Sequence, residues 1–215
     1  MGRRGGAATL VQPTSRAGWV HAGLVAAALF ALYAATAPRT VALEDDGLFI
    51  LASYYLGGAH PPGYPLFVLI GKLFTLLPIG SVAYRVHLAS AFFGAVSCGI
   101  LWLCARALLG HRVPAYLAAF GFGVSPVFWS QSIIAEVYTL NTFFFLTLTL
   151  LALRACPPHA EAPAPAAPAA GDRLMPWIAF LYGLSLSNHW PLMGLVTPAL
   201  AVLLWPRRLE ILRRA

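Results

Sequence analysis

Charged residues are scarce in this sequence. Asp, Glu, Lys and Arg together make up 10% of its 215 residues, whereas an ordinary soluble domain carries about 25%. Hydrophobic residues make up 60% of the chain, and the mean hydropathy is +0.75. Long apolar runs recur along the chain, so the lipid bilayer rather than one central core is the expected solvent. The composition excludes a water-soluble globule and indicates an all-α integral membrane protein.

Cysteine is also rare, with three residues in the chain. Cys98 and Cys104 lie in one predicted helix, where six residues of separation correspond to about 9 Å of helical rise. A disulfide joins Cα atoms that are about 4.4 to 6.8 Å apart, so this pair is not expected to form one. Cys156 is isolated, and no cysteine spacing resembles a zinc site. The thiols therefore predict neither a disulfide framework nor a structural zinc ion.

Six apolar runs approach the roughly 20 residues that a helix needs to cross a bilayer. The predicted spans are Ala17–Ala37, Val86–Leu109, Val113–Trp129, Ile133–Leu153, Leu174–Ser187 and Leu192–Trp205. The first run follows basic residues, as in a signal peptide, but it is longer than the usual apolar region of about 7 to 15 residues and is expected to be an uncleaved anchor. The last two runs are short. Between them, Pro191 cannot extend the preceding helix without losing a hydrogen bond, which predicts a turn.

A further apolar run, Pro65–Ile79, carries Lys72 near its centre and could be either a poor span or an interfacial helix. The positions of the 14 basic residues favour the interfacial helix. With six spans and a cytoplasmic N-terminus, 11 of them lie inside and three outside, as the positive-inside rule requires. Another span would lower the inside count to four. The basic charge is therefore explained by topology, and no nucleic-acid partner is expected.

These spans divide the chain into three parts. They are a cytoplasmic N-terminus (residues 1–16), a transmembrane module (17–205) and a basic cytoplasmic tail (206–215). Within the module, residues 38–85 form a large external loop and residues 157–171 a Pro/Ala-rich cytoplasmic linker. The preference for Arg over Lys, with abundant Ala, indicates a GC-rich bacterial source. The expected location is therefore a bacterial inner membrane, with membrane lipid as a partner.

The external loop carries two adjacent carboxylates, Asp45 and Asp46, before an apolar stretch that ends at Gly57. One interpretation is that they cap an interfacial helix, a role for which Asp is well suited. The other is that one of them is a general base, because partial burial near the membrane surface can raise the pKa of a carboxyl group. Adjacent residues do not face each other on a helix, so the two are not expected to act as a catalytic pair.

A rigid turn follows in the same loop, with the sequence HPPGYP at residues 60–65. Its prolines restrict φ, and its glycine permits a positive φ. His60 could be a proton shuttle, a ligand contact or an interfacial histidine without a ligand. Tyr64 is either one of the aromatic residues that lie at a membrane surface or a substrate contact.

Glu136 lies near the outer end of the fourth predicted span. An ionisable group at membrane depth is a functional candidate, although Glu136 could also lie just outside the hydrocarbon and be solvated. Tyr138 and Asn141 are three residues apart and would share a helix face. His189 falls on the external side in this topology, so it could converge with the acidic residues and His60. No ligand spacing supports a metal site, and a divalent metal remains an open possibility rather than a prediction.

Five strings in these regions resemble one protein family. They are DDG at 45–47, AHPPGYPLF at 59–67, YRVHLASA at 84–91, FWSQ at 128–131 and AEVYTL at 135–140. They resemble a bacterial membrane family of formerly unknown function, which is related to eukaryotic transmembrane protein O-mannosyltransferases. The resemblance runs from about Val41 to Trp205, and HPPGYPL is its most specific element. Members of the family are usually longer, so this chain resembles their N-terminal part.

The resemblance implies a GT-C-like glycosyltransferase. Such an enzyme takes a sugar, here expected to be mannose, from a polyprenyl-phosphate donor to a hydroxyl of a protein or glycan acceptor. The family places an acidic residue in the first external loop, which implies that Asp45 activates the acceptor hydroxyl or supports the donor phosphate, with Asp46 and Glu136 as further catalytic candidates. Arg85 becomes a candidate phosphate contact. The family pattern has Glu where Leu48 stands and Asn where His87 stands.

The candidate substrate-binding residues are His60, Tyr64, Arg85, Tyr138 and His189. Two other functions are compatible with a multi-span chain of this length. One is a small transporter or lipid-handling protein, but transporters often contain inverted repeats and paired broken helices, and no repeat is visible here. The other is a non-catalytic truncated paralogue of the transferase family.

Overall fold

The computed structural model describes residues 15–43, 45–156 and 173–207, and each regular element within them is helical. The helices are α1 (Arg16–Thr36), α2 (Asp46–Tyr55), α3 (Pro65–Thr75), α4 (Val82–Leu109), α5 (Arg112–Gly123), α6 (Pro126–Ser132), α7 (Tyr138–Ala155), α8 (Met175–Leu204) and the short 3-10 turn η2 (Trp205–Arg207). The prediction of an all-α membrane protein is confirmed. Most of the predicted N-terminus and tail, and the whole Pro/Ala linker, lie outside the described residues.

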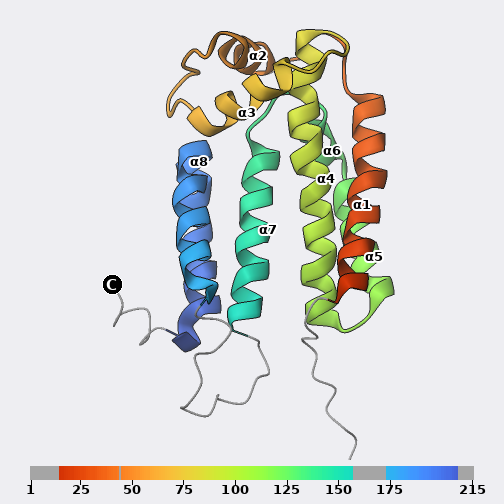
Figure 1. The fold of residues 1–215 in the computed structure, drawn as a ribbon, viewed down its shortest axis with the longest axis vertical. Helices are drawn as coiled ribbons and strands as arrows, with labels where there is room; N and C mark the ends of the chain where they lie inside the picture. Colours follow the sequence, from red (N-terminus) through yellow and green to blue (C-terminus); the bar gives the residue numbers. More distant parts are fainter. Residues whose placement is uncertain (1–14, 44, 157–172, 208–215) are drawn as a thin grey trace, which may run out of the picture.

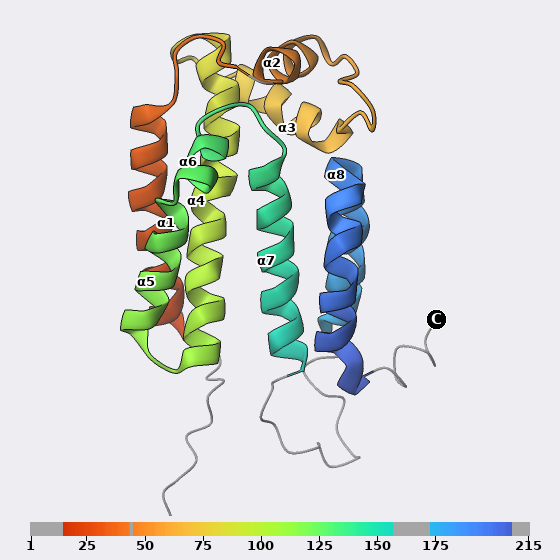
Figure 2. The same cartoon turned by 180° about the vertical axis from the view of Figure 1, so that it is seen from behind.

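The long helices run roughly parallel and form a bundle (Figure 1). Helices α2 and α3 lie across one end of it, above α7 and α8, while the α4–α5 turn lies at the opposite end (Figures 1 and 2). We call the first of these the α2–α3 end. Helix α1 begins at the far end and stops at the α2–α3 end, where α4 begins.

Three helices, α1, α4 and α7, are long and apolar enough to cross a membrane. A fourth crossing results if α5 and α6 count as one broken span, bent by 64°. The break follows Gly123 because Pro126 cannot continue a helix and instead begins the next one. The predicted span Val113–Trp129 is therefore two helices. The count of six spans stays a prediction.

Helix α8 is a hairpin of two halves. His189 has non-helical dihedral angles, with φ −146° and ψ 84°. Tyr182 and Thr197, on either side of it, hydrogen-bond through their hydroxyl groups, whereas 15 residues of straight helix would separate them by about 22 Å. The turn predicted before Pro191 is thus confirmed. Each half is shorter than the roughly 20 residues that cross a bilayer.

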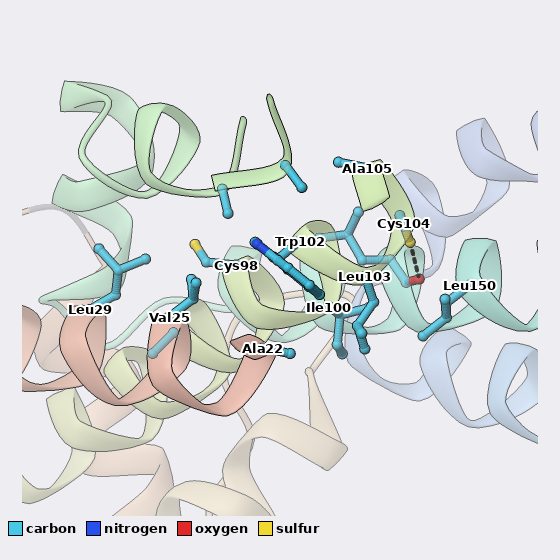
Figure 3. Close-up of a cluster of buried hydrophobic side chains, with 14 of the residues drawn as sticks. Ala22, Val25, Leu29, Cys98, Ile100, Trp102, Leu103, Cys104, Ala105 and Leu150 are labelled. Atoms are coloured by element: carbon cyan, nitrogen blue, oxygen red, sulfur yellow. Dashed lines mark hydrogen bonds between the residues drawn. The ribbon is translucent and has the colours of Figure 1, made fainter. Parts of the chain in front are cut away.

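The first hydrophobic cluster joins α1, α4, α5 and α7, and Figure 3 shows the part formed by α1, α4 and Leu150 of α7. Val25, Leu29, Trp102 and Leu103 are almost fully buried in it. Small residues bring α1 and α4 close together: a Cβ atom on Gly99 would lie 2.6 Å from the carbonyl oxygen of Ala22. The contact therefore requires glycine at this position.

A second cluster joins α2 and α3 to α4, α7 and α8. Phe49 of α2 and Phe67 of α3 are buried at its centre. Helix α3 has 11 residues, which is too short to cross a bilayer. The structure agrees with the interpretation of Pro65–Ile79 as a helix that does not span.

The predicted start of the fourth span at Ile133 is wrong, because α7 begins at Tyr138. The preceding residues, 133–137, form an irregular segment that we call the 133–137 loop. Ala135 is fully buried, yet its N–H donates to the side chain of Asp46, and Glu136 exchanges backbone hydrogen bonds with the Ser90 hydroxyl. Because side chains satisfy these backbone groups, the loop is stable inside the bundle without forming a helix.

Candidate functional site

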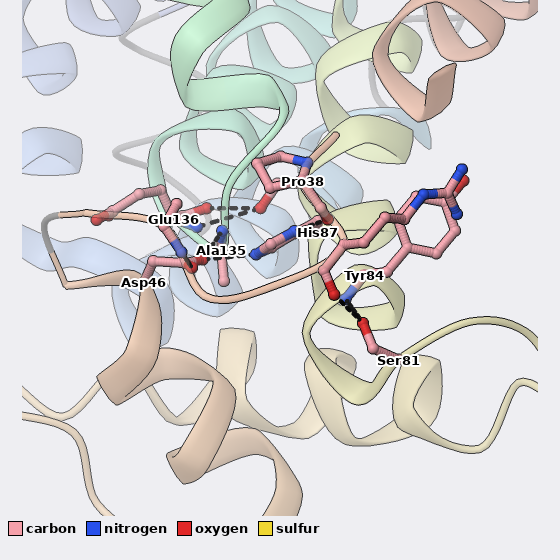
Figure 4. A network of polar contacts seen from close by, with 10 residues as sticks. Pro38, Asp46, Ser81, Tyr84, His87, Ala135 and Glu136 are labelled. Carbon is pink, nitrogen blue, oxygen red and sulfur yellow. Dashed lines mark hydrogen bonds and ion pairs between the residues drawn. The ribbon is translucent and has the colours of Figure 1, made fainter. Parts of the chain in front are cut away.

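The candidate site lies at the α2–α3 end, where four segments meet. They are the first turn of α2, the loop before α3, the 133–137 loop and the His189 turn of α8. Figure 4 shows the polar side of this junction, with Asp46, His87 and Ala135 side by side and the Glu136 side chain extending away from His87.

Asp46 is fully buried and accepts three hydrogen bonds. Its Oδ1 accepts from His87 Nε2 at 2.8 Å and from the Ala135 N–H at 2.7 Å. Its Oδ2 accepts from the Ala42 N–H at 2.6 Å. Burial alone would raise the pKa of Asp46, but the bonds from His87, Ala42 and Ala135 outweigh it and lower the pKa below its ordinary value. Asp46 is therefore an ionised anchor rather than a helix cap.

His87 of α4 is the buried partner of Asp46. Its other ring nitrogen, Nδ1, lies 3.0 Å from the carbonyl oxygen of Pro38. Both nitrogens thus face oxygen atoms that can accept a hydrogen bond. Sequence reasoning did not select His87, although it lies in the YRVHLASA string.

Asp45 precedes α2 and faces the other way. Its side chain is 56% exposed and bonds not to the helix but to His60, with Oδ2 3.0 Å from Nε2. His60 Nδ1 lies 3.0 Å from the carbonyl oxygen of Pro61. The Pro61 carbonyl first, and then Asp45, raise the pKa of His60 above its ordinary value. The capping interpretation is wrong for Asp45, since its carboxylate makes no bond to the first turn of α2.

A row of rings continues from His60 across the site. Tyr64 is in edge contact with His60, at 5.2 Å between ring centroids, and stacks on His189 at 5.4 Å. The ring centroids of His189 and Tyr138 are 6.2 Å apart. Phe49 supports His60 and Tyr64 from the buried side. The row brings together residues from the HPPGYP turn, α7 and α8.

Glu136 lies in the buried 133–137 loop, with 4% of its surface exposed. Its negative charge is a minor contribution to the raised pKa values of both His60 and Tyr64. That Glu136 and His60 share one cavity stays a prediction.

His189 is more buried than His60, and its pKa is shifted in the opposite direction. Burial first, and then the charge of His60, lower the pKa of His189 below its ordinary value, against the opposing effect of its own backbone. The ring row thus combines a histidine that favours the charged form with one that favours the neutral form.

Asn188 connects the α8 turn to the start of α7. Its Nδ2 donates to the Val137 carbonyl at 3.0 Å and to Asn141 Oδ1 at 2.7 Å. These bonds hold His189 beside Tyr138. Neither contact was predicted, because Asn188 and Asn141 are 47 residues apart in the chain.

The hydrogen bonds of Arg85 are made to backbone carbonyl oxygens and not to residues of the ring row. Its guanidinium donates to the carbonyl oxygens of Ile79 at 2.7 Å, Thr75 at 3.0 Å and Gly80 at 3.0 Å. These carbonyls lie at the end of α3 and in the turn after it. The structure thus gives Arg85 a stabilising role at that turn.

The arrangement offers two carboxylates and two histidines around aromatic and hydroxyl-bearing rings. It can take a proton from a hydroxyl group and attract a negatively charged leaving group. Within the described ranges, no group of three or more His, Cys, Asp or Glu side chains could hold a metal ion.

Comparisons with known proteins show which family the chain resembles. Residues 45–211 match the family described as the protein O-mannosyl-transferase TMEM260 N-terminal domain. The chain is 44% identical over 131 residues to the protein O-mannosyl-transferase TMEM260 of Mus musculus, covering 60% of this chain and 19% of the mouse protein. It is 31% identical over 123 residues to the corresponding protein of Dictyostelium discoideum, covering 56% of this chain and 15% of that protein. No solved structure matches.

Proposed function

Because the chain belongs to the family of the protein O-mannosyl-transferase TMEM260 N-terminal domain, we propose that it acts in sugar transfer from a polyprenyl-phosphate carrier. The sugar is mannose, and the acceptor is a hydroxyl group of a protein or glycan at the external face of the membrane. The chain spans less than a fifth of the length of the relatives it matches. In this proposal it therefore supplies the part of such an enzyme that holds the reacting groups.

One observation supports the proposal most directly: Asp45 presents a half-exposed carboxylate beside His60 at the edge of the ring row. Its Oδ1 makes no hydrogen bond within the described part of the chain and is available to an acceptor hydroxyl. In the proposed reaction, the acceptor oxygen bonds to C1 of the sugar and its proton passes to Asp45. The bond from C1 to the phosphate oxygen breaks, and the lipid phosphate leaves with the electron pair.

His60 and Glu136 have complementary roles in this proposal. A protonated His60 attracts the departing phosphate, because it supplies positive charge next to the reacting carboxylate. Glu136, in the 133–137 loop, orients sugar hydroxyl groups by accepting their hydrogen bonds. Tyr64 and Tyr138 supply further hydroxyl groups and ring faces for the sugar.

A groove next to the ring row supports the proposal of a lipid-linked donor. A groove of about 400 Å³ lies between α7 and the second half of α8. Its lining is mainly apolar and begins at Tyr138, which also contacts His189. A carrier whose phosphate lies at the ring row can extend its hydrocarbon chain along this groove.

The test is transfer of radiolabelled mannose from polyprenyl-phosphate mannose by membranes that contain the chain. Asp45→Asn should lower the rate by about 10² to 10⁴, the usual contribution of a general base, with the unfolding temperature unchanged. Glu44→Gln removes the neighbouring carboxylate and should have a mild effect. Unchanged transfer by Asp45→Asn would contradict the assignment of the base, and no transfer by the parent chain would contradict activity of this chain by itself.

A further inference from the structure

We infer that Asp46 and His87 are positioning residues, which hold the backbone segments that carry the carboxylates of Asp45 and Glu136. The inference rests on the proposed function for its consequence in catalysis, but its geometric part stands on contacts that do not depend on any reaction. In this inference Asp46, the second carboxylate of the DDG string, positions the site and takes no part in the reaction itself.

Asp46 cannot touch a substrate from its observed position. Its side chain and that of His87 are both fully buried, and both oxygens of the carboxylate already accept hydrogen bonds. Its neighbour Asp45 is half exposed. Of the two consecutive carboxylates, Asp46 therefore lies inside the bundle and Asp45 at the surface.

The bonds of the Asp46–His87 pair reach three segments that are far apart in the chain. Ala42 N–H and the Pro38 carbonyl belong to the segment between α1 and α2, and Ala135 N–H belongs to the 133–137 loop. His87 itself belongs to α4, the most buried of the candidate spans. The pair thus joins irregular backbone to the most buried of the candidate spans.

Each candidate catalytic carboxylate is the immediate neighbour of a residue in this network. Asp45 precedes Asp46, and Glu136 follows Ala135. A shift of the Ala135 backbone therefore moves Glu136, and a change at the start of α2 moves Asp45. A displacement of about 1 Å at a catalytic group can cost about 10²-fold in rate.

The first experiment measures transfer kinetics. Asp46→Ala and His87→Ala should each lower kcat about 10²-fold. The KM for the donor should rise less than kcat falls, because neither side chain touches the donor and only Glu136 moves with the loop. The double variant should be little worse than either single one, since both remove the same pair. His87→Gln should restore much of kcat, because its amide N–H can still donate to Asp46. His21→Gln, at the α1–α5 contact far from the site, is the histidine control and should be neutral.

The second experiment uses thiol labelling to follow the position of the 133–137 loop, and it does not require transferase activity. Ala135 is fully buried, so a cysteine at this position (Ala135→Cys) should react slowly with a thiol reagent. The labelling of the native cysteines is measured separately and subtracted. In combination with Asp46→Ala, Ala135→Cys should react severalfold faster. Ala119→Cys, buried in the first cluster, is the control for general unfolding and should stay unreactive in both backgrounds.

The outcomes are separable. Equal labelling of Ala135→Cys with and without Asp46→Ala, or unchanged kcat in both alanine variants, would overturn the inference. A raised KM for the donor with an unchanged kcat would indicate that the side chains contact the donor directly, and it would also overturn the inference. If the parent chain shows no transfer, activity of this chain by itself is contradicted, whereas faster labelling of Ala135→Cys would still support the positioning role.

Discussion

Asp45 and Asp46 are adjacent in the chain, but their carboxylates bond to different histidines in opposite environments. Asp45 meets His60 at the surface, and Asp46 meets His87 in the interior. Successive residues at a helix start point about 100° apart, so the first turn of α2 can direct one side chain to solvent and the next into the bundle. In each pair, the second histidine nitrogen lies 3.0 Å from a proline carbonyl oxygen. The two pairs have the same bonding pattern and differ in burial, and we propose a reactive role only for the exposed pair.

The topology can be tested with cysteines at the two ends of the bundle. Tyr55 in α2 is 74% exposed, and His111 is exposed at the opposite end, in the α4–α5 turn. If the N-terminus is cytoplasmic, as the charge distribution predicts, Tyr55→Cys should react with a membrane-impermeant thiol reagent in intact cells. His111→Cys should react only after the cells are permeabilised. The reverse pattern would place the α2–α3 end in the cytoplasm and contradict the proposed external site.

The close contact of α1 and α4 predicts a large difference between two glycines. Gly99→Ala places a Cβ 2.6 Å from the Ala22 carbonyl oxygen, so the helices must separate. We expect a loss of about 1 to 3 kcal/mol, as for other overpacked cores. Gly121→Ala is the matched control, because a Cβ there meets nothing within 4 Å, and alanine is the better helix former. Thermal unfolding in detergent measures both, and equal effects would contradict the observed packing.

Arg85 is predicted to act on stability. Arg85→Ala removes three bonds to the carbonyls after α3 and should destabilise the chain by about 1 to 3 kcal/mol. Donor affinity of the folded fraction should be unchanged. Thermal unfolding and the KM for the donor distinguish this role from the alternative. An unchanged unfolding temperature with a raised KM would favour the phosphate contact that the family resemblance implies.

Most of the helical architecture could be predicted from the sequence, because lipid-spanning helices need long apolar runs and turns need prolines. The α4 end at Leu109 and the turn before Pro191 follow from these local signals. The start of α7 could not be predicted. Residues 133–137 belong to an apolar run that resembles the start of a spanning helix. Their backbone groups instead bond to Asp46 and Ser90, which are distant in the chain.

The members of the candidate site were largely identifiable, whereas their roles were not. His60, Tyr64 and His189 could be selected because their residue types and motifs are unusual in a loop or between apolar runs. The division between Asp45 and Asp46 depends on His87, which lies 41 residues after Asp46. No local pattern encodes such a pair. For the same reason, the support that Asn188 gives to the α7 start needed the three-dimensional structure.

The final prediction concerns the titration of His60. Its pKa is raised by the Pro61 carbonyl and then by Asp45, so the folded chain favours the charged ring more than the unfolded chain does. The stability that this contact contributes should be fully present below the unfolded pKa of about 6.5 and lost as the pH rises through the folded pKa. The difference in unfolding temperature between the parent and His60→Gln should therefore be largest in mildly acidic buffer and vanish in alkaline buffer. NMR of ring-labelled histidine should show a His60 pKa above 6.5 that falls partway back in Asp45→Asn, because the Pro61 bond remains. A His60 pKa that is the same in both chains would show that Asp45 and His60 do not form a pair in solution.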